Sequence, residues 1–75
     1  MDKSTKHKNF KRIAEARTEK VLDMLDLIGN LSNTSFYEYE EKEIEAIFEA
    51  IEESVKENKA KFKNKNKKTG RRFTL

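Results

Sequence analysis

The chain has 75 residues, and its 17 Lys/Arg against 14 Asp/Glu give a net charge of +3. A chain of this length holds one small domain at most and buries a limited part of its surface. Because it contains no cysteine, disulfides and thiolate metal sites are excluded, and His7 alone cannot build an imidazole-rich metal centre. No apolar run approaches the roughly 18 residues of a membrane span, so we expect a cytoplasmic protein without a membrane partner.

A helix is predicted after a short basic leader. Residues 1–8 are polar and show no apolar periodicity, so we expect a flexible leader there. The next residues form an apolar stripe with steps of three and four, which predicts a helix over about 9–28. Gly29 and Asn30 favour the left-handed conformation, so we expect them to end this helix. The positions of the stripe are Phe10, Ile13, Ala14, Arg17, Val21, Leu22, Met24, Leu25 and Ile28.

A second helix is predicted over about 40–63. It follows a connection over 30–39 that is rich in Asn, Ser and Thr, as turns are. Glutamates in its first turn and lysines in its last turns suit the helix dipole. Residues 64–75 are basic and of low complexity, so we expect a disordered tail. The apolar stripe of this helix consists of Ile44, Ile47, Phe48, Ile51, Val55 and Phe62.

These elements predict an all-α fold. Two amphipathic helices with a short connection favour an antiparallel hairpin. Two such helices leave apolar surface uncovered, and pairing of two hairpins into a four-helix bundle is the simplest way to cover it. A homodimer, a monomer and a hetero-complex are the open alternatives.

The charges are strongly segregated along the chain. Residues 1–20 carry +4, residues 21–55 carry −9 and residues 56–75 carry +8. In an antiparallel hairpin the two basic blocks would meet at one pole, which is typical of proteins that bind nucleic-acid phosphates. Solubility and binding to an acidic protein surface are the alternative interpretations of the basic tail. The candidate nucleic-acid residues are Lys8, Lys11, Arg12, Lys61, Lys63, Lys65, Lys67, Lys68, Arg71 and Arg72.

The connection contains an aromatic group, Phe36, Tyr37 and Tyr39. One interpretation is a plug over the open end of the hairpin core, with the hydroxyls at the surface. The other is an exposed contact for a protein partner, because Tyr is enriched at interface hot spots. With Leu27 and Leu31, these aromatics form the candidate protein-interaction residues.

The sequence offers no catalytic constellation. A di-metal carboxylate site requires Glu-x-x-His motifs, and no histidine follows the glutamates of the second helix. No phosphate-binding Gly-rich loop and no nucleophile-elbow motif is present. We therefore expect no enzyme, no cofactor and no metal site.

Four short runs are more particular than a helical hairpin requires: Arg17-Thr18, residues 27–33, Tyr37-Glu38-Tyr39 and residues 47–52. With these runs the chain resembles small uncharacterised accessory proteins of plasmids and conjugative or other mobile elements in low-GC Gram-positive bacteria. The resemblance covers roughly residues 11–62 and implies a cytoplasmic accessory role with no assigned binding residues. The leading hypothesis is a non-catalytic accessory or regulatory protein that regulates or inhibits a host or element protein. The alternative is a nucleic-acid-associated protein that binds the phosphate backbone through its basic pole and tail.

Overall fold

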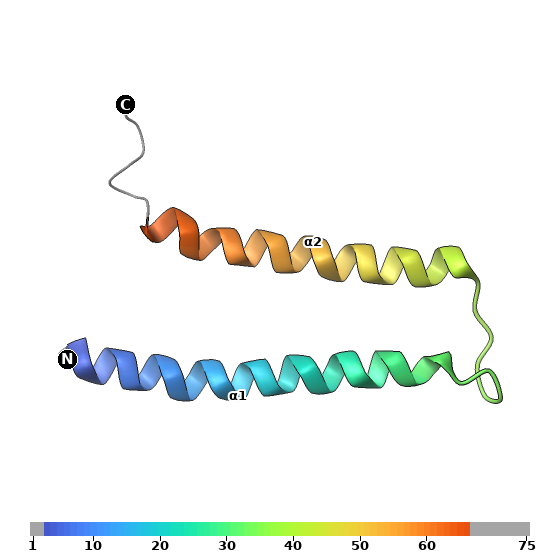
Figure 1. The fold of residues 1–75 in the computed structure, drawn as a ribbon, viewed down its shortest axis with the longest axis horizontal. Helices are drawn as coiled ribbons and strands as arrows, with labels where there is room; N and C mark the ends of the chain where they lie inside the picture. Colours follow the sequence, from blue (N-terminus) through green and yellow to red (C-terminus); the bar gives the residue numbers. More distant parts are fainter. Residues whose placement is uncertain (1–2, 67–75) are drawn as a thin grey trace, which may run out of the picture. The chain divides into compact units, whose positions relative to one another are not determined.

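The computed structural model describes residues 3–66, which form two long helices joined by a short connection (Figure 1). Helix α1 spans Lys3–Gly29, the 3-10 helix η1 spans Asn30–Ser32, and α2 spans Glu41–Asn66. The described residues contain no strand, so the all-α prediction is confirmed. The chain divides into two compact units, Met1–Glu38 and Tyr39–Leu75. The antiparallel hairpin and the four-helix bundle concern the placement of these units and stay predictions.

Helix α1 begins well before the predicted residue 9. It starts at Lys3, so the prediction of a flexible leader is wrong for residues 3–8. Lysine has a good helix propensity, and adding a turn to an existing helix costs far less than nucleating one. The rings of His7 and Phe10, one turn apart, stack with their centroids 6.5 Å apart and their planes at 12°. The helix therefore extends through residues that have no apolar periodicity.

The end of α1 is right-handed throughout. Gly29 has φ −60° and ψ −31°, and none of the described residues has a positive φ. The prediction of left-handed residues at Gly29 and Asn30 is therefore wrong. The chain tightens instead into η1, and the Asn33 N–H donates to the Asn30 carbonyl at 3.3 Å. A 3-10 turn of this kind supplies a partner for a late helix carbonyl without a residue of positive φ.

Asn33 organises the connection. Its backbone is extended, with φ −72° and ψ 101°, and its side-chain Oδ1 accepts a hydrogen bond from the Ser35 N–H at 2.9 Å. Its carbonyl accepts from the Phe36 N–H at 3.1 Å and from the Tyr37 N–H at 3.0 Å. This is an Asx turn followed by a wider backbone turn. The predicted connection over 30–39 is thus a 3-10 turn followed by an Asn-nucleated turn.

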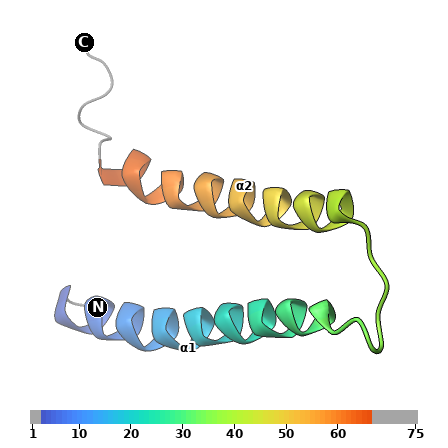
Figure 2. The same cartoon turned by 45° about the vertical axis from the view of Figure 1, so that its right-hand side comes forward.

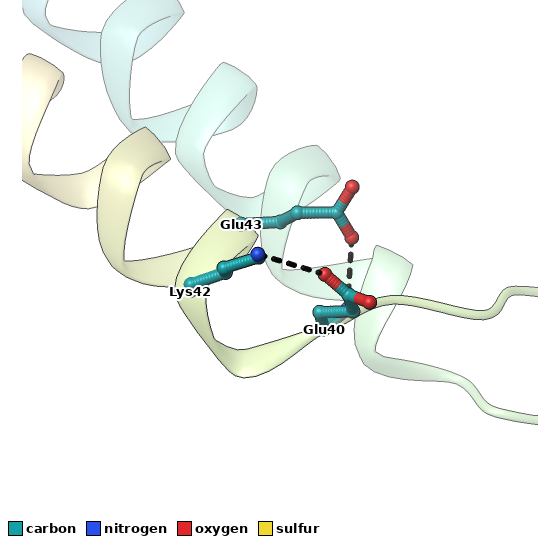
Figure 3. A network of polar contacts seen from close by, with 3 residues as sticks. All are labelled: Glu40, Lys42 and Glu43. Carbon is teal, nitrogen blue, oxygen red and sulfur yellow. Dashed lines mark hydrogen bonds and ion pairs between the residues drawn. The ribbon is translucent and has the colours of Figure 1, made fainter.

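Helix α2 begins with half of a capping box (Figure 3). The Glu40 N–H donates to Glu43 Oε1 at 2.8 Å, and the Glu40 carbonyl accepts from the Ile44 N–H at 3.3 Å. Lys42 Nζ lies 3.8 Å from Glu40 Oε1. The acidic first turn, Glu41 and Glu43, suits the positive end of the helix dipole. Glu40 therefore acts as the N-cap, as the predicted start near residue 40 requires.

The far end of α2 is longer than predicted. The helix continues to Asn66 instead of ending at residue 63, so residues 64–66 of the predicted disordered tail are helical. The rest of that tail, residues 67–75, lies outside the described residues. Both helices are drawn without a break in two views (Figure 1; Figure 2).

Neither unit has a core of its own. Within residues 3–63 no side chain is buried, and the best-covered apolar residues are only half-buried. Val21 in α1 is 56% exposed and Val55 in α2 is 58% exposed. Since a helix of this kind gains most of its stability from packing of its apolar face, both stripes require a covering surface. The half-buried apolar residues are Ala14, Leu25, Ile28, Ile44, Ile51 and Ala60.

Candidate functional site

The apolar stripe of α1 is regular. Six of its positions follow alternating steps of four and three, which keeps them on one side of a continuous helix, whereas Leu22 lies off this side. Ile13 and Leu25 widen the stripe on its two sides, and Arg17 is a charged member of it. The side is therefore apolar enough to need a partner and is interrupted by a cation. The members are Phe10, Ala14, Arg17, Val21, Met24 and Ile28.

The predicted protein-interaction residues are all exposed. Leu27 is 58% exposed, Leu31 40%, Phe36 79% and Tyr37 49%, and these four belong to the first unit. Tyr39 is 39% exposed and belongs to the second unit. We name the first four the aromatic turn surface.

Phe36 is the most exposed residue of the aromatic turn surface. Among the large apolar side chains of the described residues it has the largest exposed fraction. The turn hydrogen bonds from the N–H groups of Phe36 and Tyr37 to the Asn33 carbonyl fix the backbone that carries both rings. An apolar ring held out to solvent on an ordered backbone loses little conformational entropy when a partner covers it. The aromatic turn surface is thus suited to binding.

The basic candidates divide between the two units. Lys8, Lys11 and Arg12 lie on α1 and are exposed. At 3.6 residues per turn, Lys8 and Arg12 lie on the side of α1 opposite Phe10. Arg12 Nη2 donates to Asn9 Oδ1 at 3.4 Å, an exposed contact that leaves the other guanidinium donors for a ligand. One helix therefore has an apolar side and, near its N-terminus, a basic side.

The remaining basic candidates lie at the other end of the chain. Lys61 and Lys63 are exposed on α2, and Lys61 Nζ donates to Asn58 Oδ1 at 3.1 Å. Lys65 lies within the helical range of α2. Because the two basic segments belong to different units, the basic pole stays a prediction. Lys67, Lys68, Arg71 and Arg72 lie outside the described residues.

One residue with a structural role at these surfaces was missed from the sequence. Asn33 fixes the aromatic turn, and the signal for it was an Asn two residues before Ser35, the spacing of an Asx turn.

The described part of the chain carries few features of other kinds of site. Residues 3–66 place no three His, Asp or Glu side chains where they would share a metal ion. Neither α1 nor α2 is long and apolar enough over its described length to cross a membrane. A shallow open hollow follows Ala46 and Ala50 on α2, between longer Glu and Lys side chains. It lies on the side of that helix away from the apolar stripe.

The chain matches no protein-family model, no curated protein and no solved structure. The resemblance to accessory proteins of mobile elements therefore stays a prediction. Assignment of a function rests on the geometry and charge of the two units.

Proposed function

We propose that this chain is a non-catalytic accessory or regulatory protein of a mobile element, and that it binds a protein partner through the aromatic turn surface. The observation that carries the proposal is Phe36, which is 79% exposed on a turn fixed by hydrogen bonds to Asn33. Aromatic rings presented in this way are frequent hot spots of protein interfaces. Leu27 and Leu31, both exposed, supply apolar surface within the same unit.

The mobile-element setting and the cytoplasmic location rest on the resemblance of residues 11–62. In that setting the partner is a host protein or a protein of the element, and binding regulates or inhibits it. Tyr39 extends the predicted contact along the chain beyond the first unit.

The test is site-specific photocrosslinking in cells that carry the element. A photoreactive phenylalanine analogue at residue 36 is expected to crosslink one discrete partner, whereas the analogue at Leu22 is not. Leu22 is a suitable control because it is 53% exposed on α1, lies outside the aromatic turn surface and, at 3.6 residues per turn, lies off the side of α1 that Val21, Met24 and Ile28 share.

Affinity for the captured partner is then measured with purified protein. Combined Phe36→Ser and Tyr37→Ser substitutions are expected to weaken binding by about 2 kcal/mol or more, which is roughly 30-fold. Leu22→Ser removes an exposed apolar side chain outside the aromatic turn surface and is expected to leave affinity unchanged. Unchanged affinity in the Phe36/Tyr37 variant, with helicity preserved by circular dichroism, would refute the proposal.

A second candidate function is binding to nucleic-acid phosphates. The observation that favours it is the extended α1, which orders Lys8, Lys11 and Arg12 near the helix N-terminus. A cluster of exposed cations on one ordered segment is the electrostatic footprint of binding to a nucleic-acid backbone. Residues 67–75, which lie outside the described residues, would add phosphate contacts if that part of the tail behaves as the sequence predicts.

This candidate is tested by fluorescence anisotropy with a labelled DNA duplex at low and near-physiological salt. We expect affinity that falls steeply with salt, with each phosphate contact adding about 0.9 to the logarithmic slope. Replacing Lys8, Lys11 and Arg12 together by Gln is expected to lower that slope by up to about 3. Lys42→Gln, in the acidic first turn of α2, is the control. No binding at low salt would remove this function.

A further inference from the structure

Five members of the apolar stripe of α2, together with Asn58, have the spacing of a coiled-coil seam, and Ile47 flanks it. These six positions recur at alternating steps of four and three, which is the a/d pattern of two packed helices. Phe48 is 39% exposed, Val55 58% and Phe62 63%, so the unit by itself leaves this seam uncovered. The six positions are Ile44, Phe48, Ile51, Val55, Asn58 and Phe62.

The seam is symmetric about the middle of the helix. Read from opposite ends, it matches Ile44 with Phe62 and Ile51 with Val55. In an antiparallel pair of α2 helices, seam residues of one copy therefore pack against seam residues of the other along the whole helix. The third match sets Phe48 against Asn58.

Asn58 is compatible with a covered seam because its amide already has partners in its own helix. Its Nδ2 donates to the Ser54 carbonyl at 2.8 Å and lies 3.4 Å from Ser54 Oγ. Its Oδ1 accepts from Lys61 Nζ at 3.1 Å. A polar side chain satisfied in this way avoids the cost of an unpaired buried group.

The two halves of α2 also carry complementary charges. Residues 41–53 contain six Glu and one Lys, whereas residues 56–63 contain four Lys and one Glu. A second copy placed antiparallel sets the acidic half of each helix against the basic half of the other, whereas a parallel copy sets like charges together. Glu45 and Lys59 flank the seam at equivalent positions, one in each half, and face each other between antiparallel copies.

We propose that α2 pairs antiparallel with α2 of a second copy of this chain, forming a two-fold dimer. Ile51 and Val55 pack at its centre, and Glu45 of each copy lies against Lys59 of the other. The dimer uses a different surface from the aromatic turn and goes beyond the proposed function, so either can fail alone. It is also compatible with the four-helix bundle predicted from the sequence.

The first test is sedimentation equilibrium of the full chain over a range of concentrations. We expect a reversible monomer–dimer equilibrium. Glu45→Lys and Lys59→Glu should each weaken the dimer about tenfold at low salt, because two symmetric attractions become repulsions. The double variant, which restores opposite charges, should regain most of the affinity. Glu53→Lys is the control, since it makes the same charge change on the side of α2 opposite the seam.

The register makes a sharper prediction at Glu52, which flanks the seam beside the two-fold axis and faces its own copy. Glu52→Gln removes a like-charge contact and should tighten the dimer about twofold to fivefold at low salt. An unchanged dissociation constant for both Glu52→Gln and Glu45→Lys would overturn the proposed register.

The relative orientation of the two α2 helices is tested by disulfide crosslinking. No native thiol competes with the introduced ones, because the natural chain contains no cysteine. Glu45→Cys mixed with Lys59→Cys should crosslink rapidly on oxidation, whereas Glu45→Cys alone should not. Glu52→Cys should crosslink with itself, and Glu53→Cys, on the opposite side, is the negative control. A strictly monomeric chain at all concentrations, or self-crosslinking of Glu45→Cys as fast as Glu52→Cys, would overturn the proposal.

Discussion

Gly29→Ala should stabilise the protein, because Gly29 lies in a right-handed helical conformation. Its φ is −60° and its ψ −31°, and a Cβ added there would meet nothing within 4 Å. The substitution removes conformational freedom from the unfolded chain without a clash, which is worth about 0.5–1 kcal/mol. For a chain of this size, that corresponds to a rise in midpoint of about 2–8 °C.

The assay is thermal unfolding of the full chain followed by far-ultraviolet circular dichroism. Ala50→Gly, at an exposed position within α2, makes the reverse exchange and should lower stability by about 0.5–1 kcal/mol. A left-handed Gly29 would reverse the sign, since alanine there costs about 1–2 kcal/mol. A fall in midpoint for Gly29→Ala, together with a smaller fall for Gly29→Asn, would refute the right-handed ending of α1.

Three further predictions concern the ends of the helices and the turn. Glu43→Ala should lower stability by about 0.5–1 kcal/mol because the Glu40 N–H loses its acceptor, whereas Glu43→Gln keeps an acceptor and should lose less in urea unfolding. Asn33→Ala should speed proteolysis within the turn, whereas Asn33→Asp should preserve its resistance. Combined Lys3→Glu and Lys6→Glu substitutions should slow amide exchange at residues 7–10, the first N–H groups with acceptors inside α1, because each acidic residue lowers the free energy of the closed N-terminal turns by about 0.3–1 kcal/mol.

The two helices could be predicted from the sequence because apolar residues recur on one face of each. This apolar periodicity identifies the helix face that packs against another surface, and it stops at the last apolar residue. The helix itself continues for as long as its residues tolerate the conformation, which is why α1 reaches back to Lys3 and α2 runs on to Asn66. The predicted left-handed conformation at the end of α1 was wrong for a related reason. A glycine permits a left-handed conformation but does not require one.

The candidate residues at the connection could be predicted from their composition, but their exposure could not. An aromatic residue in a short connection either packs on a neighbouring helix or stands in solvent, and local propensity is the same in both cases. Hydrogen bonds from the N–H groups of Phe36 and Tyr37 to the Asn33 carbonyl determine the turn that exposes Phe36. These bonds depend on backbone dihedral angles at Asn33, which composition alone does not specify.

The charge layouts of the two helices have different explanations. In α2, acidic residues precede basic ones, which suits the helix dipole and also suits antiparallel pairing, so the gradient alone does not separate these causes. In α1 the first turn has no acidic residue and the last turn no basic one, and cations such as Lys3 and Lys8 occupy the N-terminal turns. That layout opposes the dipole, so helix stability does not account for it; the second candidate function, binding to nucleic-acid phosphates, would account for it. Salt titration separates the two helices, because DNA affinity should depend on the cations of α1 whereas dimer affinity should depend on Glu45 and Lys59 of α2.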